Sequence, residues 1–276
     1  KRGTPEWKIF EGLLLAAARE LGHEIIAQEE HPLVADENVA DVAFRFYVHK
    51  SRRDIPGGDF FWMQMHLREL FTLDSEGWGF DHSALRASKS SRPACTAFIH
   101  LDAAVARAEC QKLSEDFLST GISKHEQSAT TPPTPDRFLL VPLQVPNDYT
   151  IRYHSAVSLL EFIQAVADWS TRTQTHVVIK QHPMSVWDDG LKKLLSTVEA
   201  ECPWVHRLEG NIHELIRRSE GLLVINSGTG FEGLIHGKPV CTFGACDYGV
   251  VTFHGKLENL DPALDYIRSY SQKQRD

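Results

Sequence analysis

The second half of the chain alternates short apolar runs with amphipathic stretches. Four runs rich in Val, Leu and Ile predict strands, and four segments with apolar residues at helical spacing predict helices. The predicted strands are 138–145, 175–180, 221–226 and 239–244, and the predicted helices are 155–171, 187–199, 212–219 and 230–237. Because nearly continuous apolar strands are typical of strands buried on both faces, this order predicts an α/β domain with a parallel sheet flanked by helices.

The first half of the chain has a less regular pattern. Apolar residues recur at helical spacing from Pro5, with Gly22 placed to end that helix, and again over 101–118, ending near Gly121. Segment 39–49 is rich in Val, Phe and Tyr and predicts a strand. The aromatic residues 60–62 are more typical of core than of a platform on which an acceptor sugar stacks. We expect a smaller α/β domain over 1–121.

A polar segment separates the two halves. Residues 122–136 contain no large apolar residue after Ile122 and include three prolines, a composition that favours an extended connection outside any core. The sequence therefore predicts a linker over 122–136 and a second domain over 137–276.

Composition narrows the functional classes. The formal charge of −8 and the absence of a dense basic stretch argue against nucleic-acid binding. The five cysteines are far apart and odd in number, as expected for reduced thiols in the cytoplasm. The apolar run 12–18 is too short to span a bilayer. The basic cluster 50–53 is typical of a solvated turn, with contact to anionic lipid as a second interpretation.

The most specific segment runs from the third predicted strand into a helix. The strand ends at Asn226, and the small residues Ser227, Gly228 and Thr229 allow a close backbone approach where helix N–H groups can receive a phosphate. Glu232, expected in the first helical turn, could bind a ribose or complement the helix dipole. An ordinary strand–turn–helix crossing explains the glycines equally well.

Two further candidates follow the other central strands. Lys180 and His182 could neutralise a leaving phosphate without a metal, with His182 also donating a proton, or they could be a solvated charge and a loop residue fixed by Pro183. Asp148 could attack an anomeric carbon or stabilise an oxocarbenium ion, or it could cap a helix, unless that helix starts at Ser155.

These segments resemble those of a known family. The order of Gln144-x-x-x-Asp148, Lys180-x-His-Pro and the run from Asn226 to Val240 is similar to the capsule polysaccharide biosynthesis family, whose characterised enzymes include retaining β-Kdo glycosyltransferases. The resemblance covers about 138–248. It implies a GT-B-like fold of two Rossmann-like domains, with a reduced or divergent N-terminal one, that uses CMP-Kdo as donor and a glycan or glycolipid as acceptor.

The resemblance also implies roles for individual residues. Asp148 would be the nucleophile, and Lys180 and His182 would hold the donor phosphate or carboxylate. Ser227 and Glu232 would contact the cytidine nucleotide. The set of nucleotide-site residues that it predicts is Gln144, Lys180, His182, Asn226, Ser227, Gly228, Thr229 and Glu232.

The first half matches the family only loosely. Segment 74–84 is similar to the acidic, Gly-rich stretch that supplies the acceptor-side base, which makes Glu76 the candidate base and Asp81 and His82 the alternates. The expected glycine-rich N-terminal loop is not evident. The resemblance implies that this half binds the acceptor and that the second half binds the nucleotide.

No cofactor and no metal are expected. Asp188 and Asp189 are adjacent, so they lack the DxD spacing of metal-dependent sugar transferases and predict the start of a helix. Two other functions stay open: a transferase or epimerase that uses a UDP-sugar, and a non-catalytic subunit that binds a nucleotide or glycan. Under each of these functions we expect a cytoplasmic protein that could contact the inner membrane peripherally or bind other polysaccharide-assembly proteins.

Overall fold

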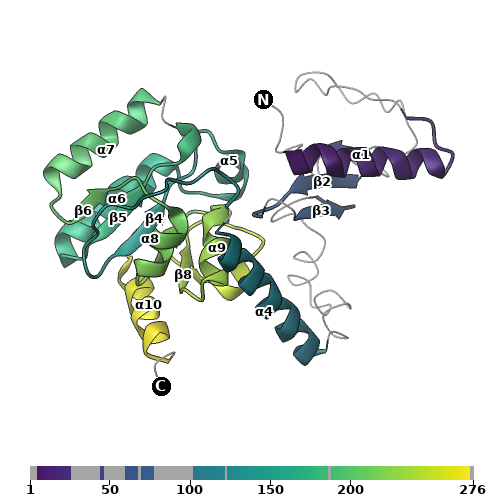
Figure 1. Ribbon diagram of the computed structural model, residues 1–276. Helices are drawn as coiled ribbons and strands as arrows, with labels where there is room; N and C mark the ends of the chain where they lie inside the picture. Colours follow the sequence, from purple (N-terminus) through teal and green to yellow (C-terminus); the bar gives the residue numbers. More distant parts are fainter. Residues whose placement is uncertain are drawn as a thin grey trace. The chain divides into compact units, whose positions relative to one another are not determined.

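A computed structural model describes residues 5–25, 44–46, 60–67, 70–77, 102–121, 123–185 and 188–273. The chain forms two compact units, 1–99 and 100–276, and each unit is described by itself (Figure 1). The division between them lies upstream of the predicted linker over 122–136.

The first unit joins a helix to a small mixed sheet. Its described elements are α1 (Pro5–Glu20), β1 (Phe44–Phe46), β2 (Phe60–Gln64) and β3 (Phe71–Asp74). Strand β2 pairs in parallel with β1 and antiparallel with β3. The Phe10 ring of α1 lies 5.0 Å from the ring of Trp62 and 4.5 Å from that of Phe71, centroid to centroid. Phe61 and Trp62 are buried, so this part of the aromatic stretch forms core, as predicted. Gly22 follows α1 with a left-handed φ of 80°.

The second unit contains a six-stranded parallel sheet. Its strands are β4 (Leu139–Pro142), β5 (Val177–Lys180), β6 (Val205–Arg207), β7 (Gly221–Val224), β8 (Val240–Thr242) and β9 (Phe253–His254). They are ordered β6-β5-β4-β7-β8-β9, so the direction of winding reverses between β4 and β7. All four predicted strands are confirmed. The edge-side strands β6 and β9 span three and two residues, too few to show a period in the sequence.

Helices cover both sides of this sheet (Figure 1). They are α5 (Tyr149–His154), α6 (Leu159–Thr173), α7 (Asp189–Glu201), α8 (Ile212–Arg218), α9 (Gly228–Ile235) and α10 (Asp261–Lys273). Helix α4 (Ala103–Thr120) precedes them, and its buried residue is Phe117 in the last turn. None of the helices in the described ranges has both the length and the apolar character that crossing a membrane requires.

The predicted helix over 155–171 is wrong at its start. The chain is already helical in α5, leaves the helix at Ser155, and starts α6 after Ser158. Ser158 and Glu161 form a capping box, in which the Ser158 side chain accepts from the Glu161 backbone and the Glu161 carboxylate accepts from the Ser158 backbone. The capping box marks the start of α6, which the apolar periodicity of the sequence did not distinguish from the end of α5.

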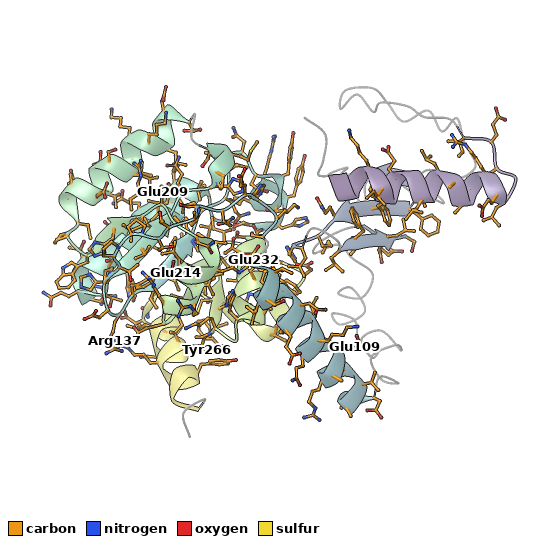
Figure 2. The ribbon with its side chains drawn as sticks, viewed as in Figure 1. Glu109, Arg137, Glu209, Glu214, Glu232 and Tyr266 are labelled. Carbon is orange, nitrogen blue, oxygen red and sulfur yellow. The ribbon has the colours of Figure 1, made fainter. Side chains whose placement is uncertain are left out.

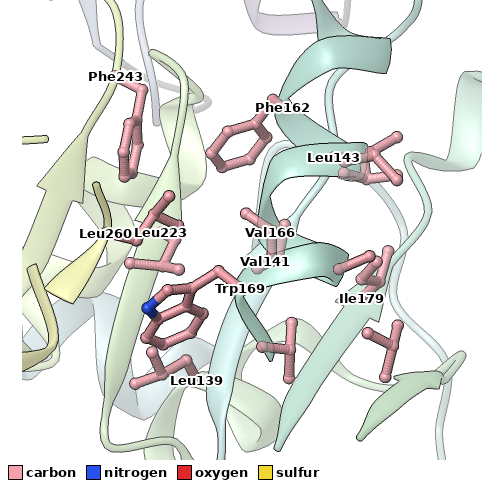
Figure 3. Close-up of a cluster of buried hydrophobic side chains, with 14 of the residues drawn as sticks. Leu139, Val141, Leu143, Phe162, Val166, Trp169, Ile179, Leu223, Phe243 and Leu260 are labelled. Atoms are coloured by element: carbon pink, nitrogen blue, oxygen red, sulfur yellow. The ribbon is translucent and has the colours of Figure 1, made fainter. Parts of the chain in front are cut away.

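Alternate strand residues fill two separate cores. Leu139, Val141 and Ile179 point to the side covered by α6, α7 and α10, where Trp169 also packs (Figure 3). Leu140 points to the opposite side, covered by α8 and α9. Because successive strand residues face opposite sides, a sheet that is apolar at every position must be covered on both. The predicted parallel α/β architecture is thus confirmed.

The segment after α4 packs on the second unit. Gly121 ends α4 with a φ of 59°, and Phe117 in the last turn lies edge-on to His213 at 4.9 Å between ring centroids. Ser123 is buried, so the expectation that 122–136 stays outside the core was wrong at this residue. A polar segment can be buried when its side chains find hydrogen-bond partners, and Ser123 finds one in Glu232.

Candidate functional site

Two amide side chains meet where the sheet reverses its winding. The Gln144 Nε2 group, after β4, donates to Asn226 Oδ1 at 3.0 Å, and the Asn226 backbone N–H donates to Gln144 Oε1 at 3.3 Å. Both side chains are buried. Asn226 also donates to the backbone carbonyl of Thr150 at 2.8 Å. In open α/β sheets this crevice, outside the carboxyl ends of the strands, is where ligands bind.

Asp148 caps helix α5 beside these amides. Its Oδ1 atom accepts from the Thr150 backbone N–H at 2.8 Å and from the Thr150 hydroxyl at 2.7 Å. Its Oδ2 atom lies 3.3 Å from Gln144 Nε2. The cap interpretation of Asp148 is confirmed, whereas no role was predicted for Thr150. A nucleophilic role remains a prediction, and it falls to Oδ2 because Oδ1 already accepts two short hydrogen bonds.

The turn after β7 leads into helix α9, close to the predicted position. Ser227 is the N-cap residue, and its hydroxyl accepts from the Thr229 backbone N–H at 3.3 Å. The Tyr248 hydroxyl donates to the Ser227 backbone carbonyl. The helix starts at Gly228, two residues before the predicted start. The turn is therefore fixed from two sides, by its own cap and by Tyr248.

Glu232 differs from its expected position. Because α9 starts early, Glu232 lies in the second turn, where the helix dipole stabilises a carboxylate little. The side chain is 3% exposed, and its Oε1 accepts from the Ser123 hydroxyl at 2.8 Å. Glu232 thus joins α9 to the segment that follows α4 (Figure 2).

Lys180 is the last residue of β5, and His182 lies in the loop that follows. Burial lowers the pKa of Lys180, and the charges of Glu209 and Glu232 oppose that shift (Figure 2). The Met184 backbone N–H donates to His182 Nδ1 at 3.0 Å, so a neutral His182 ring carries its proton on Nε2. Burial, followed by the charge of His125, lowers the pKa of His182 to about 4. At neutral pH His182 can therefore donate a hydrogen bond, whereas the predicted proton donation needs a ligand that raises its pKa.

Two basic residues at this place, Lys124 and His125, were not among the predicted site residues. Burial lowers the pKa of Lys124, while the carboxylates of Asp148 and Glu232 raise it. The His125 ring lies edge-on to the His182 ring at 4.7 Å between centroids. Both residues belong to the predicted linker, where composition gave no reason to expect a buried position.

The acceptor-side candidates belong to the other unit. The Glu76 backbone N–H donates to Asp74 Oδ1 at 2.8 Å. Asp81 and His82 lie outside the described residues. Over the described ranges, no group of three or more His, Cys, Asp or Glu side chains is arranged as a metal site.

The match to a known protein family covers more of the chain than the three sequence segments that suggested the family. A profile described as "Capsule polysaccharide biosynthesis protein" matches residues 98–259. The chain belongs to this family. The match begins close to the start of the second unit and includes α4, the segment after it and all six parallel strands. The family identification from the three sequence elements is thus confirmed.

The chain is also similar in sequence to known capsule polysaccharide proteins. The chain is 32% identical over 133 residues to the capsule polysaccharide export protein KpsS of Escherichia coli, covering 44% of this chain and 34% of KpsS. It is 29% identical over 124 residues to the capsule polysaccharide modification protein LipB of Neisseria meningitidis, and this alignment covers 41% of this chain and 29% of LipB. The alignments therefore span about a third of the length of these curated relatives.

A solved structure is similar in fold. The β-Kdo 2,4-transferase structure of Thermosulfurimonas dismutans KpsC is matched with a TM-score of 0.51 at 16% identity, over 74% of this chain and 68% of that chain. At that identity the likeness concerns the fold alone. This capsule polysaccharide biosynthesis family member thus shares its α/β fold with a sugar transferase.

Proposed function

We propose that this family member is a retaining, metal-independent glycosyltransferase. Its donor is CMP-Kdo or the CMP derivative of a related 2-keto sugar acid, and its acceptor is a glycan or glycolipid of a capsule or other surface polysaccharide. The observation that carries the proposal is the cluster at the reversal of the sheet, where Lys180 and His182 lie near the carboxylates of Asp148 and Glu232. Such a cluster suits a donor with both a phosphate and a sugar carboxylate.

In the first step Asp148 attacks the donor. Its Oδ2 atom forms a bond to the anomeric carbon while the bond from that carbon to the phosphate oxygen breaks, and the electron pair leaves with CMP. Lys180, the Nε2–H group of His182 and the backbone turn at Ser227 stabilise the phosphate charge. Gln144 and Thr150 hold the carboxylate in place through the hydrogen bonds described above.

In the second step the acceptor replaces Asp148. An acceptor hydroxyl attacks the anomeric carbon, the bond to Asp148 breaks, and the hydroxyl proton passes to Glu76 of the first unit. Two displacements at one carbon give net retention.

Replacing Glu76 with Gln should therefore slow transfer and leave CMP affinity unchanged. An unchanged transfer rate would exclude Glu76 as the base.

A second candidate function rests on the hydrogen bonds of Asp148. Its Oδ1 atom is fully engaged by Thr150, so the carboxylate has a structural role without any substrate. A non-catalytic nucleotide-binding subunit would use the same cluster for binding alone. Tight CMP binding with no turnover of CMP-Kdo would favour this candidate.

The test uses two substitutions of Asp148. Asn is as good an N-cap as Asp, so Asp148→Asn keeps helix α5 and removes the nucleophile. We expect transfer from CMP-Kdo to fall by roughly a thousandfold or more while CMP affinity and the unfolding temperature stay close to wild type. Asp148→Ala removes the cap as well, and should in addition lower the free energy of unfolding by about 1 kcal/mol.

These experiments test the nucleophile and the donor base separately. Undiminished turnover in Asp148→Asn would exclude Asp148 as nucleophile. Calorimetric titration with CMP, UMP and UDP tests the donor base independently, because the proposal predicts the tightest binding for CMP. Preference for UDP would support the UDP-sugar alternative instead.

A further inference from the structure

The segment that follows α4 is fastened to the second unit by its own side chains. Ser123 donates to Glu232 at 2.8 Å. Gln127 Oε1 accepts from the backbone N–H of Ile212, and Thr131 Oγ1 accepts from that of Asn211, both at 3.0 Å. The last two bonds satisfy N–H groups at the start of helix α8. The residues between Ser123 and Thr131 are therefore held at the site.

Lys124 follows the first of these anchors directly. Its amino group is influenced by the negative charges of Asp148, which caps α5, and Glu232, on α9. A partly buried ammonium group is stable only next to such negative charge. Lys124 thus lies close to the same two carboxylates that surround the predicted donor site.

His125 extends the cluster toward the loop after β5. Its ring meets the His182 ring edge-on at 4.7 Å, and a positive charge on His125 lowers the pKa of His182. A bound anion would relieve this repulsion. Lys124 and His125 therefore add two groups, from a third part of the chain, to Lys180 and His182.

We propose that Lys124 and His125 complete the anion-binding part of the site and receive an acidic group of the donor. The shared chemistry is that of a phosphate or a sugar carboxylate, each of which accepts charge-assisted hydrogen bonds. The inference rests on the proposed function, and it assigns donor binding to the segment between α4 and β4. Donor binding then also holds this segment against α9.

The experiment compares Lys124→Met with the wild-type chain by calorimetry. The probes are CMP, UDP, cytidine and free Kdo. If Lys124 binds the phosphate, CMP should bind roughly tenfold to a hundredfold more weakly to the variant, while cytidine and Kdo are unaffected. If it binds the sugar carboxylate, the loss should appear with Kdo. Lys124→Arg, which keeps the charge, should bind the affected probe more tightly than Lys124→Met does.

Lys112→Met is the matched control, because Lys112 is exposed on α4. It should leave every affinity unchanged. A second readout is hydrogen exchange, in which CMP should slow exchange over 123–131 in wild type and less so in His125→Gln. Thermal unfolding of each variant shows whether it is folded.

Three results distinguish the inference from the proposed function. Equal affinities of wild type and a folded Lys124→Met for CMP and Kdo would overturn the inference and leave the transferase proposal standing. A wild-type preference for UDP, with UDP binding weakened by Lys124→Met, would overturn the CMP donor and support the anion site. Absence of binding by any nucleotide or by Kdo in wild type would overturn both.

Discussion

At the scale of single residues, the site places basic groups next to carboxylates in a partly buried region. Burial lowers the pKa values of Lys124, Lys180 and His182, and the neighbouring carboxylates act in the opposite direction. Burial disfavours the charged form of a basic group, whereas a nearby anion favours it. A bound anion should therefore raise the pKa values of these groups. Donor binding and protonation are therefore coupled.

This coupling predicts how pH changes affinity. His182 has a pKa of about 4 in the free protein, held down by burial, His125, Lys180 and Lys124 and raised by Asp148. A bound anion raises that pKa, so binding takes up a proton and affinity increases as pH falls, by at most about tenfold per pH unit. The methyl ester of CMP is a suitable probe because its phosphodiester keeps one negative charge. Calorimetry from pH 8 to 5.5 measures the effect.

Two variants serve as controls for the pH experiment. His182→Gln should flatten the dependence, and His125→Gln should retain a slope because His182 remains. A wild-type affinity that does not change with pH, or an equal slope in His182→Gln, would contradict the coupling.

At the scale of elements, the strand–turn–helix unit of β7 and α9 supplies the backbone of the site. Its strand, turn and helix were predicted from the run of apolar and small residues after Gly221. The helix starts two residues earlier than predicted, and this difference matters because it places Glu232 in the second turn and not in the first. Ser227 is a favoured N-cap residue, so the cap was readable from sequence, but its support by Tyr248 joins residues distant in the chain.

Gly230 tests the packing of this unit. A Cβ atom there would lie 2.9 Å from Cζ of the buried Tyr248 ring, closer than real Cβ contacts. Gly230→Ala should therefore displace Tyr248 from the Ser227 carbonyl and lower the free energy of unfolding by about 1–3 kcal/mol, measured by urea denaturation. It should also weaken CMP binding.

Gly190→Ala is the matched control. A Cβ on Gly190, in the first turn of α7, would meet only Asp188 Oδ1 at an ordinary 3.4 Å. Alanine favours helix by up to about 1 kcal/mol over glycine, so stability should be unchanged or higher. Equal stability of Gly230→Ala and wild type would show that the Tyr248 contact does not restrict this turn.

At the scale of the whole molecule, the family match and the second unit nearly coincide. The profile covers 98–259, and the unit covers 100–276. The sequence predicted the central strands and their parallel arrangement because a sheet buried on both faces leaves an apolar pattern. It could not predict that 123–131 folds back on the site, because polar side chains that are buried by hydrogen bonding look like linker. The place of Glu76 in the reaction depends on the first unit and remains a prediction.

The account depends on one location for the nucleotide, at the carboxyl ends of β4, β5 and β7. A crystal structure of the chain with CMP measures this location directly. We expect the phosphate within hydrogen-bonding distance of Lys124 or Lys180 and next to the turn at Ser227, with Gln144 and Asn226 still paired beside it. A CMP molecule at the opposite edge of the sheet, or on a face that none of these residues lines, would contradict the account.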